Sequence, residues 1–187
     1  PMGIGSGTIV DYKGRILTNW HVVEGAEYAN AYLKPPLGEP PSTSYAVKIL
    51  KRNKKKDLAL LEFHDLPTQL TPARLAKTDT VEIGQDVHAI GHPKGEFWTF
   101  TTGTVSNYIK HTNPTSNHEA TVIMTAATLN GGNSGGPLLD DSGTVIGVNS
   151  YVRRDAAGMN YAVSAEEVRA FIAQQEPTEE DSKPELL

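Results

Sequence analysis

The sequence predicts an all-β fold made of two six-stranded antiparallel barrels and one C-terminal helix. Two observations carry this prediction. Short apolar and β-branched runs recur between Gly, Pro, Asp and Asn turn signals, and they form two groups separated near residues 66–82. Apolar residues at helical spacing, preceded by a capping signal, occur convincingly once, close to the C-terminus.

The first group of runs predicts barrel one, over about residues 3–72. Its runs are short and bounded by turn residues, which is typical of antiparallel strands. The proline-rich segment KPPLGEPPSTS (34–44) is excluded as a central strand because proline has no N–H to donate, and we interpret it as a rigid connector. The runs are SGTIVDY (6–12), RILTNWHVV (15–23), YANAYL (28–33), YAVKIL (45–50) and LALLEF (58–63).

The second group predicts barrel two, over about residues 82–164. Its runs have the same brevity and the same turn punctuation as those of the first group. They are QDVHAIG (85–91), WTFTTGTVS (98–106), ATVIMTAA (120–127), PLLD (137–140), TVIGVNSYV (144–152) and MNYAVS (159–164).

The predicted helix covers about residues 165–175. Ser164 can cap its first turn, and Glu167 follows at the capping-box position three residues later. The apolar positions of the helix are Val168, Phe171 and Ile172. Residues 1–175 are therefore expected to form one domain, and the acidic residues 176–187 a mobile tail.

Composition excludes several classes of protein and site. The 187 residues contain no cysteine, which excludes a disulfide framework and a thiolate zinc site. No histidine pair has metal-site spacing, and neither a metal nor another cofactor is expected. The formal net charge of −5 argues against general nucleic-acid binding. No apolar run reaches the roughly 18–20 residues of a membrane span, and no signal peptide is visible, so the compartment stays open between cytoplasm and periplasm.

The run KRNKKK (51–56) concentrates positive charge just before an aspartate. We interpret it as a solvated hairpin tip, which is what a short charged run usually forms. The alternative is a patch that binds substrate or nucleic acid.

The segment GGNSGGPLL (131–139) surrounds Ser134 with glycines. It is either a mobile glycine-rich loop or a tight bend that exposes bare backbone N–H groups beside a nucleophile. A serine hydroxyl is a weak nucleophile at neutral pH. The second interpretation therefore needs an imidazole to accept the serine proton and a carboxylate to orient that imidazole.

Two residues of barrel one fit these roles. His21 ends an apolar run in ILTNWHVVEGA, a rigid edge on which a base can be positioned. Asp57 stands where the chain enters the run LALLEF, so its carboxylate needs a partner such as a histidine N–H; the alternative is an ordinary strand cap. Base and orienter would lie in barrel one and the nucleophile in barrel two, so the cleft between the barrels is the predicted site.

The other histidines are given lesser roles. His88 alternates with apolar neighbours and is interpreted as a barrel residue. His92, in AIGHPKG, ends a strand and can approach the cleft, but it has no adjoining nucleophile. His64, His111 and His118 stand in polar loops, where a solvated surface role is the default.

Six segments follow one another along the chain: GIGSGTIV, ILTNWHVVEGA, DLALLEF, AIGHPKG, TAATLNGGNSGGPLL and MNYAVSAEEV. In this order they resemble the protease domain of the HtrA (Deg) family of chymotrypsin-fold serine proteases, from Gly3 to about Ile172. The resemblance implies a double-barrel endopeptidase acting on protein or peptide substrates. It also implies that His21 is the general base, Asp57 its orienting acid and Ser134 the nucleophile.

The resemblance further implies how a substrate is held. The backbone N–H groups of Gly132 and Ser134, with Asn133 between them, would form the oxyanion hole. The base of the S1 pocket would be formed by Thr128, Leu129, Asn130, Gly131, Ser150, Tyr151 and Val152. Position 128 carries no acid to pair with a cationic side chain, so we expect small or medium apolar P1 residues such as Val, Ala, Ile or Leu.

The sequence also bears on how the site is regulated and on which partners the chain has. A trypsinogen-like switch needs an aspartate at position 133, where this chain has Asn133, so that switch is excluded. We expect regulation by ordering of loops near the oxyanion hole instead. The candidate mobile loops are residues 94–98 and 107–119. No PDZ module is expected in this chain, and a homo-oligomer or a regulatory partner protein stays open. The alternative function is a protease-fold binding or chaperone-like module that a partner activates. A viral polyprotein-type protease is disfavoured by the HtrA-like segments.

Overall fold

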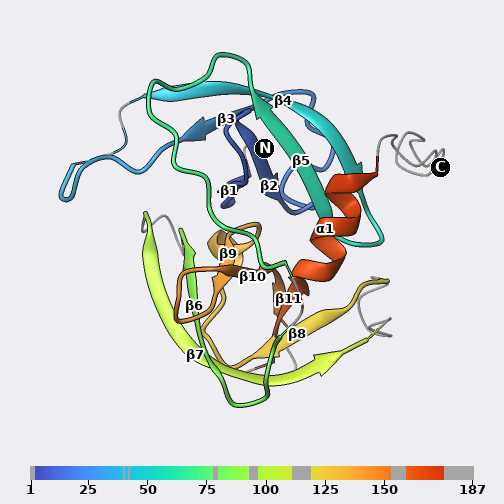
Figure 1. The fold of residues 1–187 in the computed structure, drawn as a ribbon. Coiled ribbons are helices and arrows are strands. Elements are labelled where there is room, and N and C mark those ends of the chain that lie inside the picture. The colour runs from blue at the N-terminus through green and yellow to red at the C-terminus, as the bar shows by residue number, and fades with distance from the viewer. Residues whose placement is uncertain are drawn as a thin grey trace.

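Two β-sheets, one from each half of the chain, face each other, and helix α1 lies along the side of both (Figure 1). The computed structural model describes residues 3–39, 41, 43–77, 80–92, 97–110, 119–152 and 159–174, with the side chains of 151 and 152 left aside. The tail expected at 176–187 lies outside these residues, as do 94–96 and 111–118 of the two loops expected to be mobile, 94–98 and 107–119.

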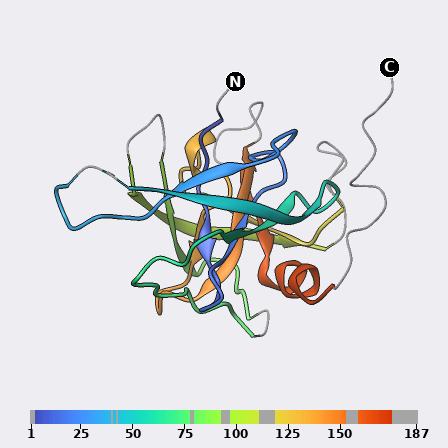
Figure 2. The same ribbon diagram turned by 90° about the horizontal axis from the view of Figure 1, so that it is seen from above.

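The first lobe is a five-stranded antiparallel sheet. Its strands are β1 (Thr8–Ile9), β2 (Arg15–Thr18), β3 (Ala29–Tyr32), β4 (Ser44–Asn53) and β5 (Leu58–Phe63), in the order β1-β2-β5-β4-β3. The connection between β3 and β4, which contains the prolines, extends on the side of the molecule opposite α1 (Figure 2).

The first lobe therefore differs from the expected six-stranded barrel by one strand. The chain that follows β5 contacts both lobes instead of adding to the first sheet. Ala73 N donates to the Ile9 carbonyl at 2.8 Å, and two residues later Leu75 forms a parallel bridge with Val145 of the second lobe. The linker thus joins the lobes, and the first sheet stays open.

The second lobe is the predicted six-stranded closed barrel. Its order is β10-β11-β8-β7-β6-β9, and pairing of Val145 with Leu139 and of Val148 with Pro137 joins the last strand to the first and closes it. The strands are β6 (Asp86–Gly91), β7 (Thr99–Ile109), β8 (Val122–Thr125), β9 (Pro137–Leu139), β10 (Val145–Val152) and β11 (Asn160–Ser164). The prediction of a two-lobed, mostly β fold with a C-terminal helix is confirmed.

Three apolar cores stabilise this arrangement: one in each lobe and one at the seam between them. Each fully buried Leu or Val side chain contributes roughly 1.5–3 kcal/mol, so the seam core is a substantial attachment between the lobes. Its buried members are Leu17, Leu58, Leu60, Ala120, Val122, Val148, Tyr161, Val163, Val168 and Phe171.

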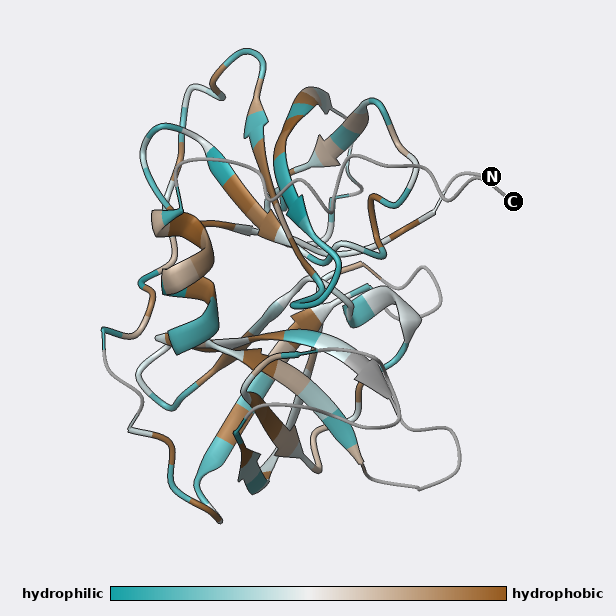
Figure 3. Ribbon diagram, turned by 90° about the vertical axis from the view of Figure 1, so that its right-hand side faces the viewer, coloured by the Kyte–Doolittle hydropathy of each residue, from teal (hydrophilic) through white to brown (hydrophobic). Residues whose placement is uncertain are grey.

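Helix α1 (Ala165–Ala173) begins at the predicted cap, where the Ser164 hydroxyl accepts the Glu167 N–H. Val168 and Phe171 turn into the seam core, and the helix carries both hydrophobic and hydrophilic residues beside the two lobes (Figure 3). Within the described residues, no helix has the length and apolar character needed to cross a membrane.

Candidate active site

Asp57 is presented by the turn that leads into β5. Its backbone is left-handed, with φ of 53°, a conformation that aspartate tolerates better than most residues. The Asp57 N–H donates to the Lys54 carbonyl at 3.2 Å, and the Asp57 carbonyl accepts from Asn19 Nδ2 at 2.9 Å. The backbone N–H and carbonyl of Asp57 are both hydrogen-bonded, and its side chain is fully buried.

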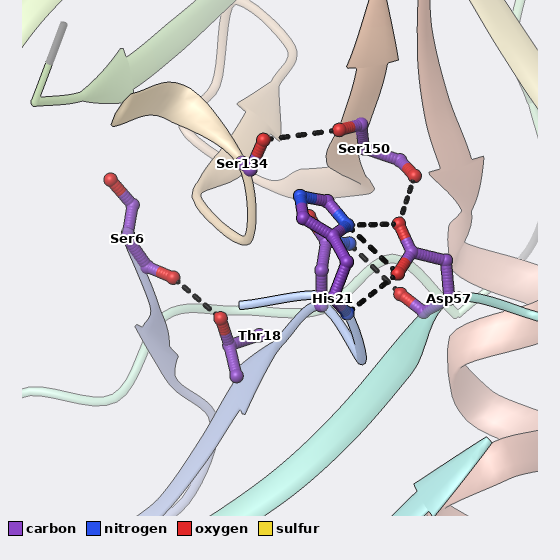
Figure 4. A network of polar contacts seen from close by, with 7 residues as sticks. Ser6, Thr18, His21, Asp57, Ser134 and Ser150 are labelled. Carbon is purple, nitrogen blue, oxygen red and sulfur yellow. Dashed lines mark hydrogen bonds and ion pairs between the residues drawn. The ribbon is translucent and has the colours of Figure 1, made fainter. Parts of the chain in front are cut away.

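His21 lies just beyond β2 and faces that carboxylate. Its backbone N–H donates to Asp57 Oδ1 at 3.0 Å, and its Nδ1 lies 2.9 and 2.8 Å from the two carboxylate oxygens. An ionised carboxylate only accepts hydrogen bonds, so Nδ1 carries the proton and Nε2 is left as an acceptor. Figure 4 shows the His21 ring between Asp57 and Ser134.

Ser150 adds a third donor to the buried carboxylate. Its hydroxyl donates to Asp57 Oδ2 at 2.5 Å. Ser150 lies where β10 shifts register against β11, between the Asn149–Ala162 and Tyr151–Tyr161 pairs. Such bulges redirect side chains beside functional sites. The expectation for Ser150 was a role in the S1 pocket; its contact with Asp57 has no signal in the sequence, because a bulge depends on the partner strand.

Ser134 is buried at the start of the chain that enters β9. Its hydroxyl donates to the Ser150 carbonyl at 3.1 Å (Figure 4). Within the described part of the chain, no hydrogen bond joins Ser134 to His21. Hydrogen bonds of catalytic groups are often absent or long before substrate binds.

The glycines after Ser134 are required by the space around them. Gly135 has φ of +86°, and a Cβ there would lie 2.2 Å from both the Ser6 carbonyl oxygen and Thr18 Oγ1. A Cβ on Gly136 would lie 2.3 Å from the Ile90 carbonyl oxygen. This crowding favours a tightly held bend over a mobile glycine-rich loop.

Ser6 anchors the same bend from the first lobe. Its N–H donates to the Ser134 carbonyl at 2.8 Å, and its hydroxyl donates to the Gly132 carbonyl at 2.7 Å. Thr18 Oγ1 in turn donates to the Ser6 carbonyl at 2.7 Å. Sequence reasoning assigned no role to Ser6; its place in GIGSGTIV is the one available signal.

Two of the residues expected to form the oxyanion hole, Gly132 and Asn133, lie in a short 3₁₀ turn, η2 (Gly131–Asn133), and the third, Ser134, follows it as the C-cap. The Asn133 N–H donates to the Asn130 carbonyl at 2.8 Å and is therefore engaged. The Gly132 carbonyl accepts from the His92 N–H at 3.0 Å in addition to Ser6. The turn is thus held by both lobes and by the strand end that carries His92.

His92 sits in an aromatic setting beside this turn. Its Nδ1 accepts the Trp98 N–H at 2.9 Å, and its ring lies edge-on to those of Phe97 and Trp98. Burial lowers the pKa of His92 below its ordinary value, which suits a neutral ring that accepts this hydrogen bond.

The residues expected in the S1 pocket have different surroundings. The Thr128 carbonyl accepts from Asn133 Nδ2 at 3.2 Å and from Thr101 Oγ1 at 3.1 Å. The Leu129 side chain is buried in the core of the second lobe, so a substrate could meet its backbone only. Asn130 and Gly131 are exposed, and the backbones of Tyr151 and Val152 pair with β11. Among the described residues, no group of three His, Cys, Asp or Glu could hold a metal ion.

The sequence model of the trypsin-like peptidase domain matches residues 5–148. The magnetosome formation protease MamE of Paramagnetospirillum magneticum is 38% identical over 172 residues, covering 90% of this chain and 23% of MamE. The chloroplastic Protease Do-like 1 of Arabidopsis thaliana is 34% identical over 179 residues, covering 93% of this chain and 39% of that protein. The chain therefore spans well under half the length of these relatives.

Solved structures share the fold. The HtrA-type protease AlgW with a decapeptide matches with a TM-score of 0.79 and 29% identity, over 93% of this chain and 53% of that chain. The inactive form of the Rv3671c protease matches with a TM-score of 0.75 and 27% identity, over 90% of this chain and 82% of that chain.

Proposed function

This chain belongs to the trypsin-like peptidase domain family, and on that premise we propose that it is a serine endopeptidase with Ser134 as nucleophile, His21 as general base and Asp57 as the group that orients His21. The observation that carries the proposal is the contact of His21 Nδ1 with both carboxylate oxygens of Asp57, at 2.9 and 2.8 Å. That contact fixes the tautomer in which Nε2 can accept a proton.

The proposed reaction forms and then hydrolyses an acyl-enzyme. The Ser134 hydroxyl turns from the Ser150 carbonyl to His21 Nε2, loses its proton to that nitrogen and attacks the carbonyl carbon of the scissile bond. His21 then gives the proton to the leaving amine, and water repeats the sequence to release the acid. The Asp57 carboxylate accepts hydrogen bonds from three donors and stabilises the imidazolium that forms during acylation and again during deacylation.

The developing oxyanion would be stabilised by backbone N–H groups at Gly132 and Ser134. Each such donor typically contributes about 2.7–4 kcal/mol to transition-state stabilisation. Because Asn133 N–H is already bonded to the Asn130 carbonyl, this residue would shape the turn without donating to the substrate.

Substrates are proposed to be proteins or peptides with a small or medium apolar P1 residue. The decapeptide in the AlgW structure supports a peptide as the ligand class. Thr128 supplies no charge to pair with a lysine or arginine, whose burial without a partner would cost several kcal/mol.

One observation favours a second candidate, a binding or chaperone-like module with little turnover until a partner binds. The Ser134 hydroxyl is bonded to the Ser150 carbonyl instead of His21. A partner that rearranged η2 or turned this side chain would then be needed for activity, and a homo-oligomer or regulatory protein could provide it.

Two measurements test the proposal. A fluorophosphonate probe should label the wild-type chain and leave Ser134→Ala unlabelled. Casein cleavage, with the cut sites mapped by mass spectrometry, should place Val, Ala, Ile or Leu at P1. Labelling that appears only with an added partner supports the second candidate. Cleavage after Lys or Arg contradicts the proposed P1 preference. Absence of labelling under every condition contradicts the proposal that the chain is a serine endopeptidase.

A further inference from the structure

The lysine run before Asp57 forms a solvated hairpin tip only in part, because Lys54 and Lys55 are exposed whereas Lys51 and Lys56 are partly buried. The side chain of Lys56 is 22% exposed, and its ammonium group forms an ion pair and hydrogen bond with the Glu167 carboxylate of α1, itself 13% exposed. Lys51 donates to main-chain carbonyls at the end of α1, at 3.2 Å for Ile172. Both lysines therefore attach the β4–β5 hairpin to the helix.

Glu167 connects three separate parts of the fold. Its N–H is capped by the Ser164 hydroxyl, its Oε1 accepts the Thr121 N–H at 3.0 Å, and its Oε2 accepts from Lys56. Burial alone would raise the pKa of Glu167, but the hydrogen bonds from Lys56 and Thr121 outweigh it, and the pKa lies below its ordinary value. The carboxylate is thus charged and shared between helix, second lobe and first-lobe turn.

The turn that carries Asp57 is short and internally bonded. The Lys56 N–H donates to Asn53 Oδ1 at 2.9 Å, and the Asp57 N–H donates to the Lys54 carbonyl at 3.2 Å. A second attachment to the other lobe lies beside the first, where the Glu119 N–H donates to the Lys55 carbonyl at 2.7 Å. A movement of this turn therefore moves Asp57.

The position of this turn matters because the site is divided between the lobes. His21 and Asp57 belong to the first lobe, whereas Ser134 and Ser150 belong to the second. The 2.5 Å contact of Ser150 Oγ with Asp57 Oδ2 crosses the seam directly. Misplacement of a reacting group by about 1 Å can reduce a rate about a hundredfold.

We propose that Lys56 and Glu167 form a positioning pair, which holds the Asp57 carboxylate in register with His21 and with the second lobe. The proposal rests on the proposed function, since it assigns the pair to the alignment of that same site. Neither side chain touches the reacting atoms; they act through the turn 53–57.

The test compares Lys56→Met, Lys56→Arg and Glu167→Gln with the wild type. Lys56→Met and Glu167→Gln should lower kcat by about ten- to a hundredfold with KM unchanged, because alignment is lost while the peptide site is intact. Lys56→Arg keeps a charge-assisted bond to the carboxylate and should restore kcat to within a few-fold of wild type. Lys51→Met is the matched control, since it loosens the same helix from the same hairpin at the end far from Asp57.

A second readout does not depend on turnover. The proton on His21 Nδ1, held by Asp57, should give a low-field proton NMR signal that is absent from His21→Ala. This signal should shift or broaden in Lys56→Met and persist in Lys56→Arg and Lys51→Met. A wild-type chain that is never labelled at Ser134 would contradict the proposed function, whereas the NMR signal would still decide the role of the pair.

The outcomes separate positioning from simple stabilisation. The proposal is supported if kcat falls in Lys56→Met and is restored in Lys56→Arg. It also requires that Lys51→Met keeps the wild-type kcat despite a lower melting temperature. If Lys56→Met loses melting temperature while kcat and the His21 proton signal match the wild type, the pair is a structural tether only and the proposal is wrong.

Discussion

The Ser134 hydroxyl donates to the main-chain carbonyl of Ser150, and the Ser150 hydroxyl donates to Asp57, so the nucleophile and the buried acid are linked through one residue. Ser150 therefore supports the acid through its hydroxyl, and its main-chain carbonyl accepts a hydrogen bond from the Ser134 hydroxyl, whose proton the proposed reaction transfers to His21.

Ser150→Ala removes one of three donors to the Asp57 carboxylate and leaves the Ser150 main chain in place. We expect kcat to fall and stability to drop by about 1–3 kcal/mol, because a buried charge loses a hydrogen bond. Steady-state kinetics and urea denaturation measure the two effects. Ser142→Ala is the matched control, since that exposed serine also donates to an aspartate, Asp140, at 2.8 Å. Equal effects in both variants would contradict a special role for Ser150.

Asp57→Asn keeps the shape of the side chain and places an amide against His21. An amide N–H facing Nδ1 favours the wrong tautomer, and we expect kcat to fall about 10⁴-fold while the chain stays folded. The control is Asp141→Asn, because Asp141 also contacts a histidine, His88, at 2.7 Å, but away from the site. Activity near the wild-type level in Asp57→Asn would exclude Asp57 as the orienting acid.

Gly135→Ala should destabilise the fold much more than Gly143→Ala. Both glycines have positive φ, +86° and +74°, but a Cβ meets backbone and side-chain atoms at 2.2 Å in the first case and nothing within 4 Å in the second. We expect a loss of about 1 kcal/mol for Gly143→Ala and about 1–3 kcal/mol more for Gly135→Ala from overpacking. Chemical denaturation checks both. Similar losses would show that the bend can relax.

His92 should make the stability of the chain depend on pH. Its pKa is lowered by burial from 6.5, so the neutral form is favoured in the folded state. The stability that this provides is present above pH 6.5 and is lost as the pH falls through the folded-state pKa. Melting temperatures between pH 5 and 8 should therefore fall more steeply toward acid for the wild type than for His92→Asn. His64→Asn, at an exposed position, should follow the wild type; parallel curves for wild type and His92→Asn would contradict the prediction.

Local sequence signals predicted a large part of this molecule. Strand length and turn residues located barrel two and the helix, and the ordered segments carried a resemblance to HtrA proteases that similarity to Do-like and HtrA-type proteases confirms. His21 and Asp57 could be paired because a base and a buried acid each need a partner. The roles assigned to these residues and to Ser134 remain predictions for the variants above.

The features that sequence reasoning missed depend on contacts between distant segments. The bulge that turns Ser150 toward Asp57 arises from the register of β10 against β11. The first lobe has five strands because the linker pairs with the second lobe at Val145 instead of adding to the first sheet. The contacts of Lys51 and Lys56 depend on where α1 packs against the hairpin. None of these is encoded in a local period or turn signal.

The seam core implies that the polypeptide could be divided without losing its ability to assemble. Leu17, Leu58 and Leu60 pack with Val148, Val163 and Phe171, so a cut in the linker after β5 would leave each fragment with an apolar face that only the other fragment covers. His21 and Ser134 would then be on different pieces, so under the proposed roles of these residues each fragment alone would be inactive, and activity would report that the two fragments have reassembled.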